Sequence, residues 1–114
     1  MIELTVLNIL KEALDVPVYM EIPETPPATF VVLEKTGSSR RDYVDSATFA
    51  AQSYAPTLQE AAELNQMVKA AFFDEVMASD SIGAVRLNSD YNFTNTATKK
   101  YRYQAVFVVT YVEV

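Results

Sequence analysis

The sequence predicts a single α+β domain, residues 1–114, in which two helices pack on one face of a mostly antiparallel β-sheet. The length of the chain fits one domain. Two segments carry apolar side chains at helical spacing, and most of the remaining segments alternate or run apolar, as strands do. Turn residues join most of these strands directly, which favours hairpins and therefore antiparallel pairing.

The first expected helix covers residues 2–14. Its apolar residues recur on one face: Ile2, Val6, Ile9, Leu10, Ala13 and Leu14. Pro17 ends the helix, because the residue before a proline avoids the helical region. A short strand over residues 18–22 and a stiff proline-containing loop over residues 23–27 follow.

The next two strands are expected to form a hairpin. Residues 29–35 are rich in β-forming side chains and predict a mostly buried strand. The Gly-Ser-Ser at residues 37–39 predicts a turn. Apolar and polar side chains then alternate over residues 40–54, which predicts a half-buried strand that returns antiparallel to its predecessor.

A second helix is expected to begin at Thr57 and to run to about Met77. Thr57 and Glu60 have the spacing of a capping box, in which the threonine hydroxyl accepts a hydrogen bond from the backbone N–H three residues later. The many alanines of this segment favour helix and allow close packing.

The last two strands follow a turn that contains Gly83. The first opens at Ala84 and continues towards Phe93, and the second covers residues 101–114. The second half of that last strand is apolar on both faces, which indicates an interior position in the sheet. Tyr, Thr and Val side chains remain for the face without helices, and exposed apolar surface of that kind often marks a contact site.

The composition excludes several kinds of active site. The chain has no Cys and no His, so disulfides, thiolate nucleophiles, Cys/His zinc sites and imidazole bases are impossible. Its two glycines are too few for a phosphate-binding loop. Asp42 and Asp45 are expected on opposite faces of a strand, and Asp74 and Glu75 point apart on a helix. We therefore expect a protein that is not an enzyme and that has no metal site or cofactor.

The charge of the chain limits its partners. A net charge of −6 gives no general attraction to nucleic acid and repels an anionic membrane surface. No apolar run approaches the ~20 residues of a membrane span. The first residues lack the basic and apolar regions of a signal peptide. The sequence therefore predicts no membrane partner.

Two basic clusters supply the candidate interface residues: Arg40 and Arg41 after the first expected hairpin turn, and Lys99, Lys100 and Arg102 around the start of the last strand. In an acidic chain, such clusters favour an acidic protein surface over DNA as the partner. The alternative is that they keep loops soluble and discourage unwanted pairing at strand ends.

The order of the expected elements resembles a known family. A helix leads into Val16–Tyr19, a proline-containing loop precedes the strand at Thr29–Leu33, an alanine-rich helix covers Thr57–Met77, and the chain closes on the strand Tyr101–Val109. This arrangement resembles the tail-completion, or tail-terminator, proteins of siphophages and prophages, and the related head-to-tail joining proteins. The resemblance spans nearly the whole chain and rests on element order and length, with no invariant motif.

The resemblance implies a structural protein that forms an oligomeric ring, commonly a hexamer, at the end of the tail tube. Such a ring stops tube growth and presents a surface to the neck and head-completion proteins. The implied location is the bacterial cytoplasm during assembly and then the virion. No catalytic residues are carried over from the family. The acidic character of the chain leaves contact with passing DNA undecided.

Two other classes remain open. One is a small, dimeric regulatory or ligand-binding module, and the other is an enzyme that uses carboxylates and tyrosines. A ring-forming protein should expose a β-edge and an apolar patch that associate into a closed ring. A ligand-binding module should have one deep pocket with converging polar groups. An enzyme should have an acid of strongly perturbed pKa in such a pocket.

Overall fold

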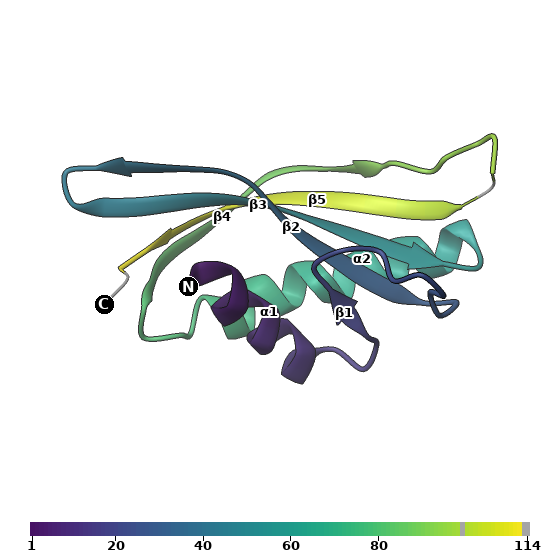
Figure 1. Ribbon diagram of the computed structural model, residues 1–114, viewed down its shortest axis with the longest axis horizontal. Helices are drawn as coiled ribbons and strands as arrows, with labels where there is room; N and C mark the ends of the chain where they lie inside the picture. Colours follow the sequence, from purple (N-terminus) through teal and green to yellow (C-terminus); the bar gives the residue numbers. More distant parts are fainter. Residues whose placement is uncertain (99, 113–114) are drawn as a thin grey trace.

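The structure is a computed structural model that describes residues 1–98 and 100–112. Its elements follow in the order α1 (Ile2–Ala13), β1 (Val18–Tyr19), β2 (Phe30–Arg41), β3 (Val44–Ala55), α2 (Leu58–Ala71), the π-helical segment η1 (Phe72–Val76), β4 (Ile82–Asn92) and β5 (Tyr101–Tyr111). Figure 1 shows α1 and α2 on the same side of the sheet. The predicted α+β class, with helices packed against a mostly antiparallel sheet, is confirmed.

The sheet has five strands in the order β1-β2-β3-β5-β4. β1 pairs with β2 in parallel, and the other three pairs are antiparallel. β5 lies between β3 and β4, so the interior position predicted for the last strand is confirmed. No helix within the described ranges is long and apolar enough to cross a membrane.

The main core lies between the helices and the face of the sheet that they cover. Its largest fully buried side chains include Phe49 of β3, Phe107 of β5, Phe72 of η1 and Leu10 of α1. The rings of Phe72 and Phe107 stack with centroids 3.9 Å apart and planes 7° apart. This stack fixes the end of the second helix against the middle of the sheet.

Polar contacts hold α2 in place at both ends. The hydroxyl of Thr57 accepts a hydrogen bond from the backbone N–H of Glu60 at 3.2 Å, which confirms the predicted cap. Farther along, Asn65 donates to one oxygen of Asp90 on β4 at 2.6 Å. Lys69 binds the other oxygen of the same carboxylate at 2.5 Å. These contacts tie α2 to the edge strand β4.

The predicted turn at residues 37–39 is wrong. β2 continues through Gly37 to Arg41, with a register shift between Lys35 and Gly37 that marks a bulge. The turn lies at Asp42 and Tyr43, whose φ angles of 52° and 68° are both left-handed. Two successive left-handed residues suit a tight hairpin, because that turn matches the twist of the flanking strands.

Other strand boundaries also differ from those predicted. β1 ends at Tyr19 instead of residue 22, and the prolines that follow at close spacing cannot donate to a ladder. Gly83 lies inside β4, at a register shift, and not in the turn before it. The last strand is described to Tyr111, and the predicted end at residues 113–114 lies outside the described residues.

The opposite face of the sheet, which we call the open face, carries no helix (Figure 1). At one end it holds a small cluster of Phe30, Val32 and Tyr54, with Tyr19 packed against it. In the middle, Val106 and Val108 are half-buried. The apolar character predicted for this face is therefore present, although it is concentrated at one end and along β5.

Candidate interaction surfaces

The first basic cluster lies at the tip of the β2–β3 hairpin. Arg40 and Arg41 are the last residues of β2 and are exposed. Arg40 Nε lies 3.6 Å from Asp45 Oδ1, and the Arg40 side chain is 67% exposed. Tyr43 in the turn is 88% exposed. The tip therefore combines cations with an exposed ring, although the two arginines end β2 and do not begin β3.

The structure describes two residues of the second basic cluster, Lys100 and Arg102. Lys99 lies outside the described residues. Lys100 is exposed and pairs with Asn95 in an isolated bridge between β4 and β5. Arg102 faces Tyr54 near the end of β3, whereas Arg41 faces the first residue of that strand. The two basic clusters thus lie at opposite ends of the sheet and are not brought together.

Arg102 is committed to contacts inside the molecule. Its Nε donates to the backbone carbonyl of Phe93 at 2.7 Å, and its Nη1 donates to the hydroxyl of Tyr54 at 2.8 Å. The guanidinium also lies 4.2 Å from the centroid of the Phe93 ring. Such contacts are typical of a cation that stabilises the fold, so Arg102 is a poor candidate for binding a partner.

Around Arg102 the open face carries a network that the sequence analysis missed. Tyr54 stacks on Phe30 with centroids 4.6 Å apart and donates to Gln52 at 3.2 Å. Gln52 donates in turn to Gln104 at 2.9 Å. Alternate positions of β3 and β5 carry these groups, so the spacing was visible in the sequence. Their pairing depends on the register of two strands about fifty residues apart along the chain.

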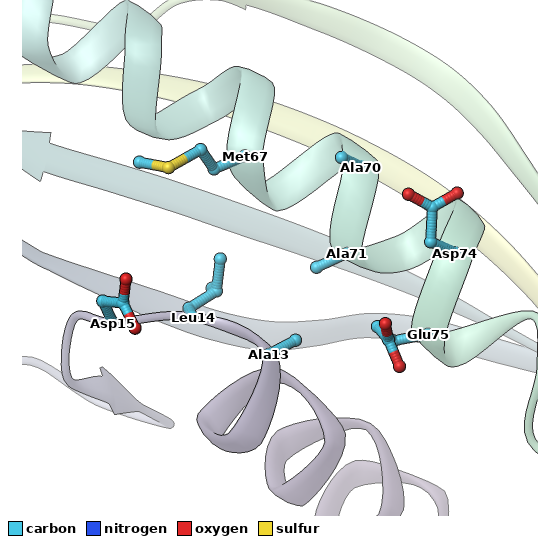
Figure 2. Close-up of a pocket in the computed structure, with 8 residues that line it drawn as sticks. All are labelled: Ala13, Leu14, Asp15, Met67, Ala70, Ala71, Asp74 and Glu75. Carbon is cyan, nitrogen blue, oxygen red and sulfur yellow. The ribbon is translucent and has the colours of Figure 1, made fainter.

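An acid-rimmed pocket lies between the end of α1 and the second helix (Figure 2). Its volume is about 260 Å³. Asp74 and Glu75 of η1 line it together with Asp15, which follows α1. Buried Leu14 and Ala71 also line the pocket. Asp74 and Glu75 were expected to point apart on a helix, and the pocket that they share with Asp15 was not predicted from the sequence.

The acids that the sequence singled out do not form a metal site in the described part of the chain. Among the described residues, no group of three or more acidic side chains could hold a metal ion. Asp42 lies in the hairpin turn, and Asp45 contacts Arg40. Asp45 therefore acts within the hairpin itself.

A second pocket, of about 210 Å³, lies beside the proline-containing loop. Its lining is mostly apolar and aromatic: Ile22, Pro26, Pro27, Ala28, Phe30, Tyr54, Ala55, Pro56, Lys100 and Tyr101. Ile22 is 50% exposed at its rim. The volume lies below the ~300–1,000 Å³ typical of small-molecule sites.

The sheet has an unpaired edge on each side within the described ranges. β4 is the outermost strand on one side. On the other side, β1 pairs only with Val31 and Val32 of β2. Along this outer edge, β2 therefore has no neighbouring strand from Leu33 to Arg41. Successive antiparallel pairings make β2 and β4 run in opposite directions. Unpaired edges are templates for pairing with another chain.

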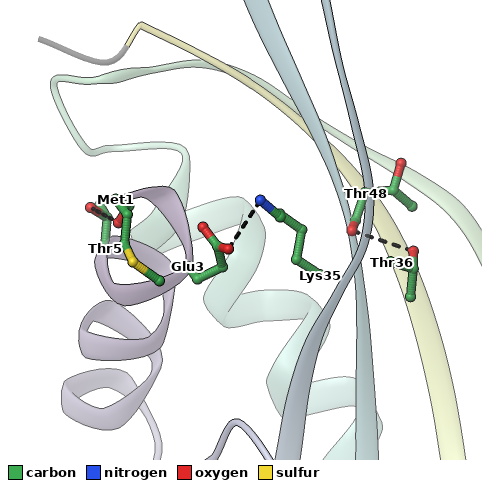
Figure 3. A network of polar contacts seen from close by, with 6 residues as sticks. All are labelled: Met1, Glu3, Thr5, Lys35, Thr36 and Thr48. Atoms are coloured by element: carbon green, nitrogen blue, oxygen red, sulfur yellow. Dashed lines mark hydrogen bonds and ion pairs between the residues drawn. The ribbon is translucent and has the colours of Figure 1, made fainter.

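An ion pair joins α1 to β2 on the helix-covered side (Figure 3). Lys35 Nζ lies 3.0 Å from a carboxylate oxygen of Glu3. The hydrogen bond from Lys35 lowers the pKa of Glu3 below its usual value. This shift has a structural cause, so it does not indicate a catalytic acid.

Comparison of the chain with protein-family models and with curated proteins finds no match.

Proposed function

We propose that the protein is a structural phage protein that assembles as an oligomeric ring, caps the tail tube and joins the tail to the head. The observation that carries the proposal is the pair of unpaired edges, on β2 and β4, which run in opposite directions. Rotation about an axis that runs roughly along the strands brings β2 of one copy beside β4 of the next in antiparallel orientation. This head-to-tail contact repeats around the axis and closes into a ring when the rotation from one copy to the next divides a full turn.

The two ends of the sheet support the same proposal. The β2–β3 hairpin turn lies at one end and the β4–β5 connection at the other (Figure 1). A ring with strands along its axis therefore has two different rims, one bearing Arg40 and Arg41 and the other bearing Lys100. A protein that joins a tail tube to neck proteins needs two different rims. The resemblance in element order is the reason for proposing a tail-completion protein in particular.

In this proposal the protein acts by contact and needs no catalytic group or cofactor. Its partners are further copies of itself, the tail-tube protein and the neck or head-completion proteins. It assembles in the bacterial cytoplasm and remains in the virion, between tail and neck. The proposal does not require contact with DNA.

Native mass tests the proposal. Light scattering over a concentration series, with and without tail-tube protein, should give a closed ring near six copies or a ring that forms only on the tube. A dimer that is indifferent to tube protein would favour the ligand-binding alternative. A monomer under every condition would contradict a ring.

Charge reversal at the hairpin tip tests the rim. Arg40→Glu with Arg41→Glu should leave the fold intact, because both side chains are exposed, but should impair assembly. Tail length and infectivity are the measurements. Lys11→Glu, at an exposed site on α1, is the control for adding negative charge elsewhere. Normal tails and normal infectivity in the tip variant would rule out this rim as a contact.

The dimeric ligand-binding module remains the second candidate, because the pocket beside the proline-containing loop is apolar and partly enclosed. A small apolar or aromatic molecule would fit its lining better than a charged one. Saturable binding of such a molecule by a stable dimer, with no response to tube protein, would favour this candidate over the ring.

A further inference from the structure

The two unpaired edges carry complementary charges. On the open face, Glu34 of β2 and Arg86 of β4 are exposed, and neither forms an ion pair with the described residues. Near the tip, Arg40 keeps most of its side chain exposed. Asp80, just before β4, is also exposed. Each edge therefore carries one cation and one anion. Each of these charges has a charge of opposite sign on the other edge.

Strand geometry restricts how two copies can meet. Residues directly opposite each other on antiparallel strands point to the same side of the sheet. Two copies with their helices on the same side can therefore slide along the contact only by even numbers of residues. Within one copy, pairing through β3 and β5 places Glu34 level with Ser89, and Gly37 level with Arg86.

We infer that β2 of one copy pairs with β4 of the next with Glu34 opposite Arg86. Within one copy, Glu34 is level with Ser89, which faces Val106 of β5, whereas Arg86 faces Val108. Counted along β5, the inferred register is therefore displaced by two residues from the level shared within one copy. The displacement is even, so the helices of both copies stay on the same side. A ring closes with this displacement when its strands tilt from the ring axis, as strands do in closed barrels. The inference rests on the proposed ring and names the contact that closes it.

The displaced register also matches the other side chains. It brings Leu33 of β2 opposite Leu87 of β4, and both residues belong to the helix-covered face. It brings Arg40 close to Asp80 in the loop before β4. Without displacement, Leu33 would instead face Asp90, whose carboxylate is already bound to Lys69. The displaced register therefore gains an apolar pair and two opposite-charge pairs.

The same structure limits the contact to one stretch of each edge. β1 covers Val31 and Val32, so pairing of β2 with a neighbour begins at Leu33. Register shifts interrupt β2 between Lys35 and Gly37, and β4 between Ile82 and Ala84 and again between Leu87 and Ser89. Bulges of this kind discourage pairing of an edge strand with unrelated chains. In the inferred contact, the opposite-charge pairs then favour the correct neighbour.

Introduced cysteines test the register directly, because the chain has no Cys of its own. Opposite residues in an antiparallel pair lie roughly 4.5–5.5 Å apart between Cα atoms, which is within the ~4.4–6.8 Å range of a disulfide. Inside one copy, β3 and β5 separate β2 from β4 by roughly 14 Å, so an internal disulfide is impossible. Oxidised Glu34→Cys/Arg86→Cys protein, with and without tail-tube protein, should give a ladder of covalent oligomers larger than dimers.

The matched control places the cysteines in the undisplaced register. Glu34→Cys/Ser89→Cys should remain largely unlinked. A ladder from the control as strong as that from the test pair would overturn the displaced register. If the double variant gave only dimers, and each single-cysteine variant gave dimers in equal amount, β2 would not pair with β4. That outcome would indicate contact between identical edges.

Charge reversal gives an independent measurement. Glu34→Arg sets two arginines opposite each other, and Arg86→Glu sets two glutamates opposite each other. Each change should raise the concentration at half-assembly by about tenfold. A mixture of the two variants should assemble at the wild-type concentration, because alternating copies restore an opposite charge at every contact. Unchanged assembly in both single variants would overturn the inference.

The contact and the phage function can fail separately. A cross-linked ring that neither binds nor caps tail tubes would refute the proposed function and leave the contact standing. Normal tail capping, with no ladder and no response to charge reversal, would refute the contact and leave the function standing.

Discussion

The two faces of the sheet are built on different principles. The helix-covered face buries Phe49 and Phe107 completely, and Phe72 stacks on Phe107 from the helix layer. The open face instead has a small buried cluster of Phe30, Val32 and Tyr54 at one end. Half-buried side chains, hydrogen bonds and ring contacts around Arg102 make up the rest of its contacts. The difference indicates that folding energy comes mainly from the covered face. The open face and the strand edges are then available for contacts at little cost to stability.

The largest expected effect breaks the covered face. Phe107→Ala should lower the free energy of unfolding by about 3–5 kcal/mol, because it removes a fully buried ring and leaves a cavity against Phe72. Urea unfolding monitored by circular dichroism measures this change.

Val108 supplies the matched control, since it is the next residue on β5 but points to the half-buried open face. Val108→Ala should cost clearly less, about 1 kcal/mol. Equal losses at Phe107 and Val108 would mean that the two faces contribute alike, contrary to the comparison.

An intermediate effect is expected where the open face is most organised. Arg102→Met keeps an unbranched apolar stem but removes the donors to Tyr54 and to the carbonyl of Phe93. The loss should be about 1–2 kcal/mol, measured by thermal or urea unfolding at low protein concentration.

Lys11 provides the reference for this substitution, because it is exposed on α1 and forms no ion pair with the described residues. Lys11→Met should change the stability by less than about 0.5 kcal/mol. If Arg102→Met were equally neutral, Arg102 would be a free surface charge, as the sequence analysis first assumed.

The same contrast explains what the sequence could and could not predict. Both helices, the Thr57 cap and the interior position of β5 were predicted, because each follows from a local pattern: helical spacing of apolar residues, a capping box, and apolar side chains on both faces of a strand. The hairpin turn was misplaced because Gly37 is a strong local turn signal, whereas continued pairing of β2 with β3 favours the turn at Asp42 and Tyr43. At this point the long-range pairing of the two strands overrides the local turn propensity of Gly37.

The candidate surfaces were predicted less well for a related reason. Exposure of Arg40 and Arg41 follows from their place near a turn, and the structure agrees. The role of Arg102 depends on which residues of β3 and β4 come beside it, and no local pattern contains that register. The pocket shared by Asp15 and Asp74 likewise requires the packing of α1 on the second helix.

The smallest expected effect tests the covered face at its polar rim. Hydrogen bonding to Lys35 lowers the pKa of Glu3 below its usual 4.5. A carboxyl group with a lowered pKa stabilises the fold above the unfolded-state pKa, and that stability is lost as the pH falls through the folded-state pKa. Glu3→Gln should therefore be slightly less stable than the wild type at pH 7.

Thermal midpoints of both proteins between pH 7 and pH 3 measure this difference. The gap should stay constant down to about pH 4.5 and then close as the wild-type carboxylate takes up its proton, because the glutamine cannot titrate. A gap that is independent of pH would assign the effect of the substitution to packing. In that case the ion pair between α1 and β2 would contribute nothing measurable, as is common for ion pairs near a protein surface.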